Sequence, residues 1–328
     1  MVFFRCGMRM RSFHLPMLRP VLLNLVLQTA AFAQPLTTEF QKSTVDRISE
    51  LLNQNYVFPD VARSSGKHLE SRLAEGTFDE LTDLRSFARS LTRELQEVSH
   101  DKHLRVRPTD PEGSEQPEAD NSRGFRESKV LAGNIGYIDM RGFAPVSLAA
   151  NVADNHMSVV RDVDALIIDM RRNGGGDPAM VQYMCSYFFT TRIHLNSIYN
   201  RIRDSTTEYW TIPVNGKKLP DVPLYVLTSG FTFSGGEEFA YNMQTQKRAT
   251  LIGETTGGGA NPGDRFTIND KLFIFIPTGR AINPITGTNW EGTGVVPEIK
   301  LPGDQAFEKA VELAKEAGMK YRKKGGAR

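Results

Sequence analysis

The residue best placed for chemistry is Ser234, which lies between an expected strand and an expected helix. Residues 223–227 form a β-branched and aromatic apolar run that is typical of a buried strand. Residues 239–244 contain helix formers, so Ser234 comes where the chain turns from strand to helix. A hydroxyl at a helix N-terminus can attack a carbonyl group while the N–H of Gly235 faces the oxyanion that forms. The alternative is an ordinary N-cap, because Ser234 followed by Glu237 also makes a capping box.

A second segment that could do chemistry is the triple glycine at 174–176, which follows an expected strand at 165–170. This arrangement resembles a phosphate loop, but it lacks the Lys-Ser/Thr pair of a P-loop and the spacing of the dinucleotide fingerprint. The backbone N–H groups of such glycines can instead donate to an oxyanion. A plain tight turn between strand and helix is the alternative interpretation.

Two further segments supply an imidazole and a carboxylate. His100 and His103 lie close together, and histidine is the usual general base for a serine nucleophile. Either histidine could instead be merely solvated, and a metal site made of His100, Asp101 and His103 lacks further histidine or cysteine ligands at a suitable spacing. Glu291 follows a tryptophan and lies between glycines, where it could orient a base as the acid of a triad does. Its alternative is a surface carboxylate in a turn.

The elements that position these residues fall into two kinds. Apolar residues at helical spacing predict a helical N-terminal domain at 34–107, which is followed by a polar, exposed loop at 108–128. Strand–turn–helix units then repeat, which predicts an α/β core at 129–328. The strand at 165–170 is almost continuously apolar, as expected for a strand that is covered on both faces.

The composition of the 328-residue chain, with 40% hydrophobic and 24% charged residues, is that of a soluble globular protein. Its net charge of +2 gives no reason to expect nucleic acid as a partner. A basic region followed by a short apolar run predicts a signal peptide at 1–33, cut after Ala33, and hence a secreted or periplasmic protein. A retained membrane anchor is the alternative, although the run is too short to span a bilayer. The sequence has two cysteines, and Cys6 lies in the expected signal peptide. The other, Cys185, lies in an apolar run and is expected to be buried and inert.

The order and spacing of these segments resemble the C-terminal-processing serine peptidase family over nearly all of the expected mature chain. The family pattern D-x-R-x-N-x-G-G is met at 169–176, and T-S-x-x-T-x-S-x-x-E is met at 228–237. The pattern V-G-E-x-T-x-G is met at 252–258 with isoleucine in first place. The late pattern G-x-G-V-x-P-D-I is met at 292–299, with Glu298 in place of the aspartate.

Two departures favour one branch of this family. No lysine follows the third pattern, as the branch with a Ser–Lys dyad requires, and the loop leaves no room for the PDZ domain of that branch. The chain is more similar to the branch that contains the tricorn protease core and the modules of interphotoreceptor retinoid-binding protein. That resemblance implies Ser234 as nucleophile, His103 as base with His100 as the fallback, and Glu291 as the orienting carboxylate. The serine that precedes the tricorn histidine is replaced here by Lys102.

The resemblance also implies the fold and the activity. The implied oxyanion donors are the N–H groups of Gly235, Gly175 and Gly176. The expected fold is a helical N-terminal bundle followed by an α/β core of the crotonase-like, Clp-protease-like type. The expected activity is that of a serine peptidase acting on polypeptides, with no metal or organic cofactor and no membrane span in the mature chain. A catalytically silent module that binds apolar ligands is the alternative, and the oligomeric state is open, with a homo-oligomer as one option.

Overall fold

The computed structural model describes residues 1–2, 36–109 and 122–326 of the chain. The signal peptide expected at 1–33 lies almost wholly outside the described residues and stays a prediction. Within the described ranges, no helix combines the length and the apolar character needed to cross a membrane.

Three helices open the described chain, as the sequence predicts. They are α1 (Thr38–Asn55), α2 (Pro59–Ala74) and α3 (Leu84–Ser99). The side chain of Thr37 caps α1, that of Asp83 caps α3, and α2 has proline at its first position, where the missing N–H costs nothing. His100 caps the C-terminus of α3, and its φ of 55°, in the left-handed region, turns the chain sharply after the helix.

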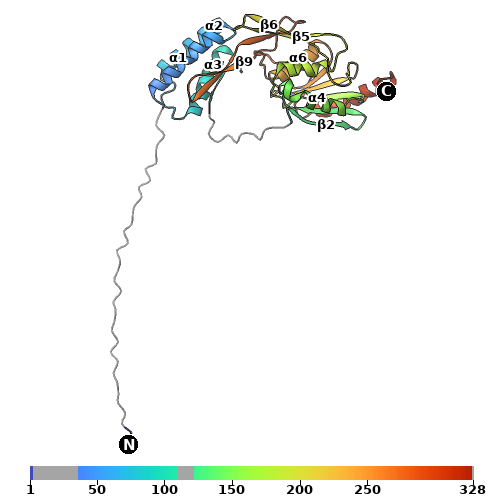
Figure 1. The fold of residues 1–328 in the computed structure, drawn as a ribbon, viewed down its shortest axis with the longest axis horizontal. Helices are drawn as coiled ribbons and strands as arrows, with labels where there is room; N and C mark the ends of the chain where they lie inside the picture. Colours follow the sequence, from blue (N-terminus) through green and yellow to red (C-terminus); the bar gives the residue numbers. More distant parts are fainter. Residues whose placement is uncertain (3–35, 110–121, 327–328) are drawn as a thin grey trace. The chain divides into compact units, whose positions relative to one another are not determined.

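The core of these helices includes a strand from far along the chain. An antiparallel sheet of order β1-β10-β9 is built from β1 (Arg105–Pro108), β9 (Gly263–Thr267) and β10 (Leu272–Pro277). The apolar residues Leu272, Ile274 and Ile276 of β10 pack into the hydrophobic core of the three helices. Figure 1 shows the blue and green helices beside the orange-red strand β9. The sequence predicts the hairpin of β9 and β10 but not its place against the helices.

The second part of the chain contains a six-stranded sheet of order β12-β8-β7-β4-β3-β2, in which only β2 and β3 run antiparallel. Its strands are β2 (Phe125–Leu131), β3 (Ile135–Met140), β4 (Ala165–Asp169), β7 (Leu224–Thr228), β8 (Thr250–Gly253) and β12 (Ile299–Lys300). Strand β2 begins at Phe125, inside the segment at 108–128 that the sequence assigns to a loop, because its exposed face is polar.

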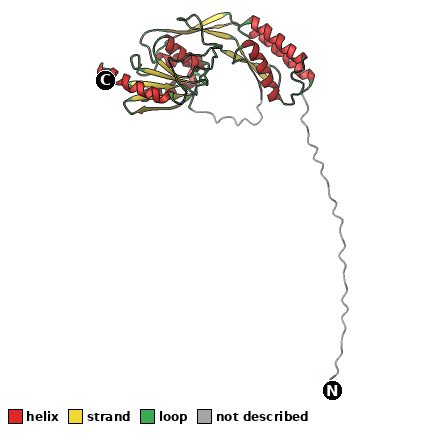
Figure 2. Ribbon diagram, turned by 180° about the vertical axis from the view of Figure 1, so that it is seen from behind, coloured by secondary structure: helices red, strands yellow, loops and turns green. Residues whose placement is uncertain are grey.

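Helices cover this sheet, as in an α/β fold (Figure 2). They are α4 (Val146–Val159), α5 (Pro178–Ser186), α6 (Gly235–Thr245) and α7 (Ala306–Lys323). The first three share one hydrophobic core with the sheet, whereas α7 packs its alanines into a separate core on the strands. Cys185 is buried in the first of these cores as a free thiol, which confirms the expectation from sequence. A small antiparallel sheet of order β11-β5-β6 adds β5 (His194–Asn200), β6 (Ser205–Trp210) and β11 (Gly279–Ile282).

The parallel pairing of β4 and β7 places two chemically interesting segments side by side. Asp169 at the end of β4 is in register with Leu227 near the end of β7. The carboxyl ends of parallel strands lie at the same edge of a sheet. The glycines at 174–176, which follow β4, and the turn at Ser234, which follows β7, therefore both lie at that edge. The backbone confirms the contact, since the N–H of Phe233 donates to the carbonyl of Asn173 at 3.0 Å.

Candidate active site

Ser234 occupies a strained turn at the N-terminus of α6. Its φ of 52° and ψ of −121° lie in a region that residues with a side chain rarely adopt. A serine on a sharp, strained strand-to-helix turn is how several hydrolases expose a nucleophile. The backbone N–H of Ser234 donates to Oε2 of Glu237 at 2.9 Å, so the glutamate half of the capping box is formed. Capping and presentation of the hydroxyl are therefore compatible, and the two interpretations of Ser234 do not exclude each other.

Glu237 does more than cap the helix. Its buried carboxylate accepts hydrogen bonds from the N–H groups of Gly258 (2.6 Å) and Gly259 (2.8 Å) and from the hydroxyl of Thr256. Burial raises the pKa of Glu237, and these hydrogen bonds oppose that rise. Glu237 thus joins the Ser234 turn to the segment at 256–259, a role that its place in the capping box did not indicate.

The two expected oxyanion donors of the triple glycine differ in their hydrogen bonds. The N–H of Gly175 already donates to Oδ1 of Asn173 at 2.8 Å, which makes it less suited to an oxyanion than the sequence suggests. Among the described residues, no hydrogen bond occupies the N–H of Gly176 or of Gly235. A Cβ built on Gly235 would lie 3.1 Å from the nitrogen of Gly176, which shows how closely the two N–H groups approach. Both glycines line the cavity that Ser234 also lines.

Glycine is required at 176 for steric reasons. Its φ is +141°, and a Cβ there would meet the carbonyl oxygen of Phe143 at 2.0 Å. Phe143, which follows β3, pairs with Gly176 in an isolated β-bridge. In this bridge the N–H of Phe143 donates to the carbonyl of Gly175, and the N–H of Asp177 donates to the carbonyl of Phe143. The side-chain amide of Asn173 anchors the other end of the bend by donating to the carbonyl of Met140 at 3.0 Å.

His103 lines the same cavity, which has a volume of about 400 Å³. Its side chain is 11% exposed and its ring packs on that of Phe233, with centroids 4.6 Å apart. Gly259 permits this approach, since a Cβ there would lie 2.8 Å from Cε1 of His103. No hydrogen bond joins His103 to Ser234 in this structure, and catalytic contacts of this kind are often long before substrate binds. The structure therefore brings the serine and the imidazole to one cavity.

Two carboxyl groups lie behind the imidazole. A ring nitrogen of His103 and one carboxylate oxygen each of Asp101 and Glu291 are all within 4.8 Å of one another. The buried Nδ1 of His103 lies 3.9 Å from Oδ1 of Asp101, and it has no hydrogen-bond partner among the described residues. Oε1 of Glu291 is likewise buried and unpaired, while Oε2 accepts from the N–H groups of Ala260 and Asn261. Glu291 is thus near the imidazole, as the sequence analysis expects.

Asp101 is a site residue that the sequence analysis considered only as a metal ligand. It is 1% exposed, and it accepts hydrogen bonds from the N–H of His103 (3.0 Å), the hydroxyl of Tyr56 (3.1 Å) and the amide of Asn261 (3.0 Å). These donors occupy both of its oxygens, which suits a group that positions the histidine better than one that binds a cation. In the sequence, only its position two residues before His103 indicates that Asp101 could position the histidine.

The charges around the imidazole determine its protonation. Burial, with a contribution from the positive charge of Arg105, lowers the pKa of His103 to about 4. The imidazole is therefore neutral at pH 7, the state in which it can accept a proton. Burial and, to a lesser extent, the charge of Asp101 raise the pKa of Glu291. Burial also raises the pKa of Asp101, and the hydrogen bonds that its carboxylate accepts oppose that rise.

The fallback base, His100, lies elsewhere. It is exposed at the end of α3, where its N–H donates to the carbonyl of Gln96 at 2.9 Å, and it does not line the cavity. Lys102 does not line the cavity either, and its Nζ donates to the carbonyl of Gly257 at 2.6 Å. Between the two histidines, the geometry favours His103.

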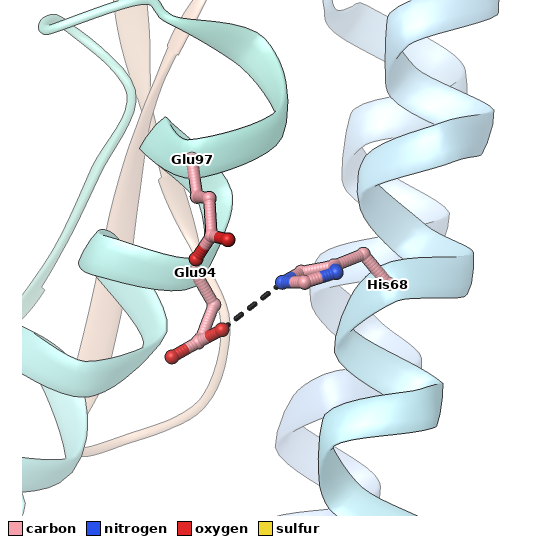
Figure 3. A group of neighbouring side chains, drawn as sticks. All are labelled: His68, Glu94 and Glu97. Atoms are coloured by element: carbon pink, nitrogen blue, oxygen red, sulfur yellow. Dashed lines mark hydrogen bonds and ion pairs between the residues drawn. The ribbon is translucent and has the colours of Figure 1, made fainter.

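A second group of titratable side chains lies between α2 and α3 (Figure 3). His68 points from α2 toward Glu94 and Glu97 of α3, and its Nε2 is 3.0 Å from Oε2 of Glu94. The spacing could hold a metal ion, but Glu94 is also paired with Arg72 and Arg93, each at 3.1 Å. Two guanidinium groups oppose a cation at this carboxylate, so the group is better described as an ion-pair network that joins the two helices.

Comparison with known proteins identifies the family of this chain. The model of peptidase family S41 matches residues 134–301, and that of the N-terminal domain of peptidase S41 in eukaryotic IRBP matches residues 29–132. The chain is 26% identical to a carboxyl-terminal-processing protease of Synechocystis sp. over 192 residues, covering 55% of this chain and 44% of the relative. It is 25% identical to a tail-specific protease of Haemophilus influenzae over 189 residues, covering 53% of this chain and 26% of the relative.

The chain thus spans less than half the length of these two curated relatives. Among solved structures, a protein of Parabacteroides merdae described as a candidate peptidase is similar in fold. Its TM-score is 0.61 at 19% identity, and the match covers 84% of this chain and 96% of that chain. Because the S41 model matches more than half of the sequence, the chain belongs to peptidase family S41.

Proposed function

We propose that the protein is a serine peptidase that hydrolyses peptide bonds, with Ser234 as nucleophile, His103 as general base and Glu291 as the carboxyl group that orients the histidine. Membership of family S41 supports the peptidase activity. The observation that carries the assignment of residues is the shared cavity. Ser234 in its strained turn, the imidazole of His103 and the unoccupied N–H groups of Gly176 and Gly235 all line it.

The reaction divides into two acyl transfers. Oγ of Ser234 attacks the carbonyl carbon of the peptide bond, while His103 accepts the proton of the hydroxyl. The negative charge that develops on the carbonyl oxygen is stabilised by the N–H groups of Gly176 and Gly235. The C–N bond then breaks, and His103 returns the proton to the leaving amine. Water, deprotonated by the same histidine, releases the acyl group and restores Ser234.

The carboxyl groups of Asp101 and Glu291 stabilise this cycle from behind the imidazole. When both ring nitrogens of His103 are protonated, the imidazolium lies next to the carboxyl groups of Asp101 and Glu291. Negative charge on this pair offsets the unfavourable effect of burying the imidazolium. Asp101 also fixes the backbone of His103 through the hydrogen bond to its N–H. In this arrangement Glu291 and Asp101 hold the imidazole in place, and neither one contacts the substrate.

Labelling with a fluorophosphonate probe tests the proposal directly, because an activated serine attacks the phosphorus of such a probe, displaces fluoride and becomes phosphonylated. We expect the wild type to be labelled and Ser234→Ala not to be. For His103→Ala, we expect the labelling rate to fall by about 10⁴-fold, the usual cost of removing a triad base. His100→Ala is the matched control, since it removes an imidazole three residues away that does not line the cavity.

Two results would contradict the assignment. If His100→Ala were as damaging as His103→Ala, the base would be wrongly assigned. If the wild type showed no labelling that depends on Ser234, and bound a fluorescent fatty acid or retinoid saturably, the alternative of an apolar-ligand module would be favoured.

A further inference from the structure

The sheet β1-β10-β9 has two faces of opposite character. Side chains alternate along a strand, so residues in register across the three strands share a face. The row that packs into the core of the helices consists of Val106, Ile274 and Phe266. The adjoining row turns to the other face and consists of Arg105, Phe275 and Arg265. The next residues on that face are Arg107 and Phe273, which are also in register with each other.

These five residues form what we call the arginine–phenylalanine surface: Arg105, Arg107, Arg265, Phe273 and Phe275. A cavity of about 220 Å³ lies over most of it. Its lining also includes His103 and Phe233, which together with Phe275 line the cavity of Ser234 as well. The surface therefore adjoins the candidate active site directly, on the side of the general base.

The surface carries three positive charges that no ion pair among the described residues neutralises. Arg105 is half-buried, and its Nε donates only to the carbonyl of Lys102. Burial, and to a lesser extent the charge of Arg107, lower the pKa of Arg105, while the charge of Asp101 partly opposes them. An anion placed here would relieve the cost of holding like charges together.

The aromatic rings favour a ligand that is not a bare ion. The guanidinium of Arg265 lies 3.5 Å from the ring centroid of Phe273, and that of Arg105 lies 5.8 Å from the centroid of Phe233. Stacking on these rings leaves the edges of the guanidinium groups, where the N–H donors are, free to bind an acceptor. Half-exposed phenylalanines beside the donors suit a chain that carries apolar groups next to its anionic group.

We propose, on the basis of the proposed peptidase function, that the arginine–phenylalanine surface binds the carboxylate of an acidic side chain of the polypeptide substrate. A guanidinium binds a carboxylate through two parallel hydrogen bonds, which gives both affinity and orientation. The surface would thereby set which peptides enter the cavity of Ser234 and how far from the carboxylate they are cut.

Matched peptides bound to the inactive Ser234→Ala protein test this proposal without relying on catalysis. One pool contains aspartate and glutamate, and the other contains asparagine and glutamine at the same positions. Each pool is made with a free and with an amidated C-terminus, and affinities are measured by calorimetry. We expect a carboxylate to improve binding about tenfold, the size of one charge-assisted hydrogen bond, and less at high salt.

The same measurement is repeated after Arg107→Ala and Arg265→Ala are added together. Both arginines are exposed, so the fold should survive, and the advantage of the carboxylate should disappear while neutral peptides bind as before. Arg126→Ala is the control, because Arg126 is also an exposed arginine on a strand, in β2. We expect the preference to be lost in the amide pool and kept on amidation, and a preference that is lost only on amidation would overturn the proposal.

Equal binding of all four pools would overturn the proposal, as would an advantage that survives the loss of both arginines. Failure of the peptidase function would appear differently. In that case the wild type would show no labelling of Ser234, whatever the peptides do. An intact preference for carboxylates without labelling would keep the surface as a binding site and remove only the chemistry.

Discussion

At the residue scale, the environment of His103 is unusual for a general base. The ring is buried against Phe233 and near the charge of Arg105, and both effects favour its neutral form. The carboxyl groups of Asp101 and Glu291 lie on the other side, where they stabilise a proton once it has been transferred. The neutral imidazole is the form that accepts a proton from Ser234 in the proposed mechanism.

This environment predicts the pH dependence of Ser234 labelling. The pKa of His103 is lowered from 6.5 to about 4, so the imidazole stays neutral and competent as the pH falls from 7. We expect the labelling rate of the wild type to hold through pH 6 and to fall only as the pH approaches 4. The rate is measured at each pH by gel fluorescence, with circular dichroism as a control for folding. A midpoint near 6.5, with the fold intact, would show that burial does not shift this histidine.

At the element scale, the glycine bend at 174–176 decides whether the oxyanion donors are aligned. The bend is held by the carbonyl of Phe143 on one side and the side chain of Asn173 on the other. Its middle glycine touches the Ser234 turn, since a Cβ on Gly175 would meet Cβ of Ser234 at 2.7 Å. Strand β4 and strand β7 fix this contact because each delivers its segment to the same edge of the sheet.

Two alanine substitutions within the bend should have opposite outcomes. Gly176→Ala places a Cβ 2.0 Å from the carbonyl oxygen of Phe143 at a φ of +141°. We expect it to lower the free energy of unfolding by about 1–3 kcal/mol, the usual cost of backbone strain, and to abolish Ser234 labelling by displacing the N–H. Gly174→Ala meets nothing within 4 Å and should leave stability nearly unchanged. Chemical denaturation and labelling of both variants provide the test, and equal stability of the two would contradict the steric argument.

At the scale of the whole molecule, the helical region shares one hydrophobic core with the strands next to His103. Strand β10 packs Ile274 and its neighbours into the core of α1, α2 and α3, and β1 pairs with it directly after the segment that carries His103. Asp101 and Asn261 are hydrogen-bonded across 160 positions of the sequence. His103 is therefore held in place by contacts between segments that lie far apart in the sequence.

This shared core predicts that the helices and the active site unfold together. Ile274→Ala should lower the free energy of unfolding by about 2–5 kcal/mol, as for other buried isoleucines, and loss of helix and loss of Ser234 labelling should coincide in urea. Ile285→Ala is the matched control, because Ile285 is 55% exposed, and its effect should stay within about 0.5 kcal/mol. Two separate transitions would show that the helical region is an independent unit.

Much of this protein could be predicted from its sequence because the decisive patterns are local. The apolar strand before Ser234, the glycines after Asp169 and the helical spacing before residue 100 each depend on neighbouring residues, and all three appear in the structure as expected. The α/β class follows from the same kind of pattern. The order of these motifs also pointed to family S41, which the family model confirms.

The tertiary structure decided what local patterns could not express. His100 and His103 are equivalent as residue types, and only the left-handed turn after α3 sends one to the surface and the other into the cavity. Gly175 and Gly176 are equally free of side chains, yet the amide of Asn173 occupies only the N–H of Gly175. Glu237, Asp101 and strand β10 acquire their roles through partners far along the chain. The reason is physical: a residue's type and neighbours fix what it can donate, accept or bury, but only the packed chain fixes which group lies opposite it.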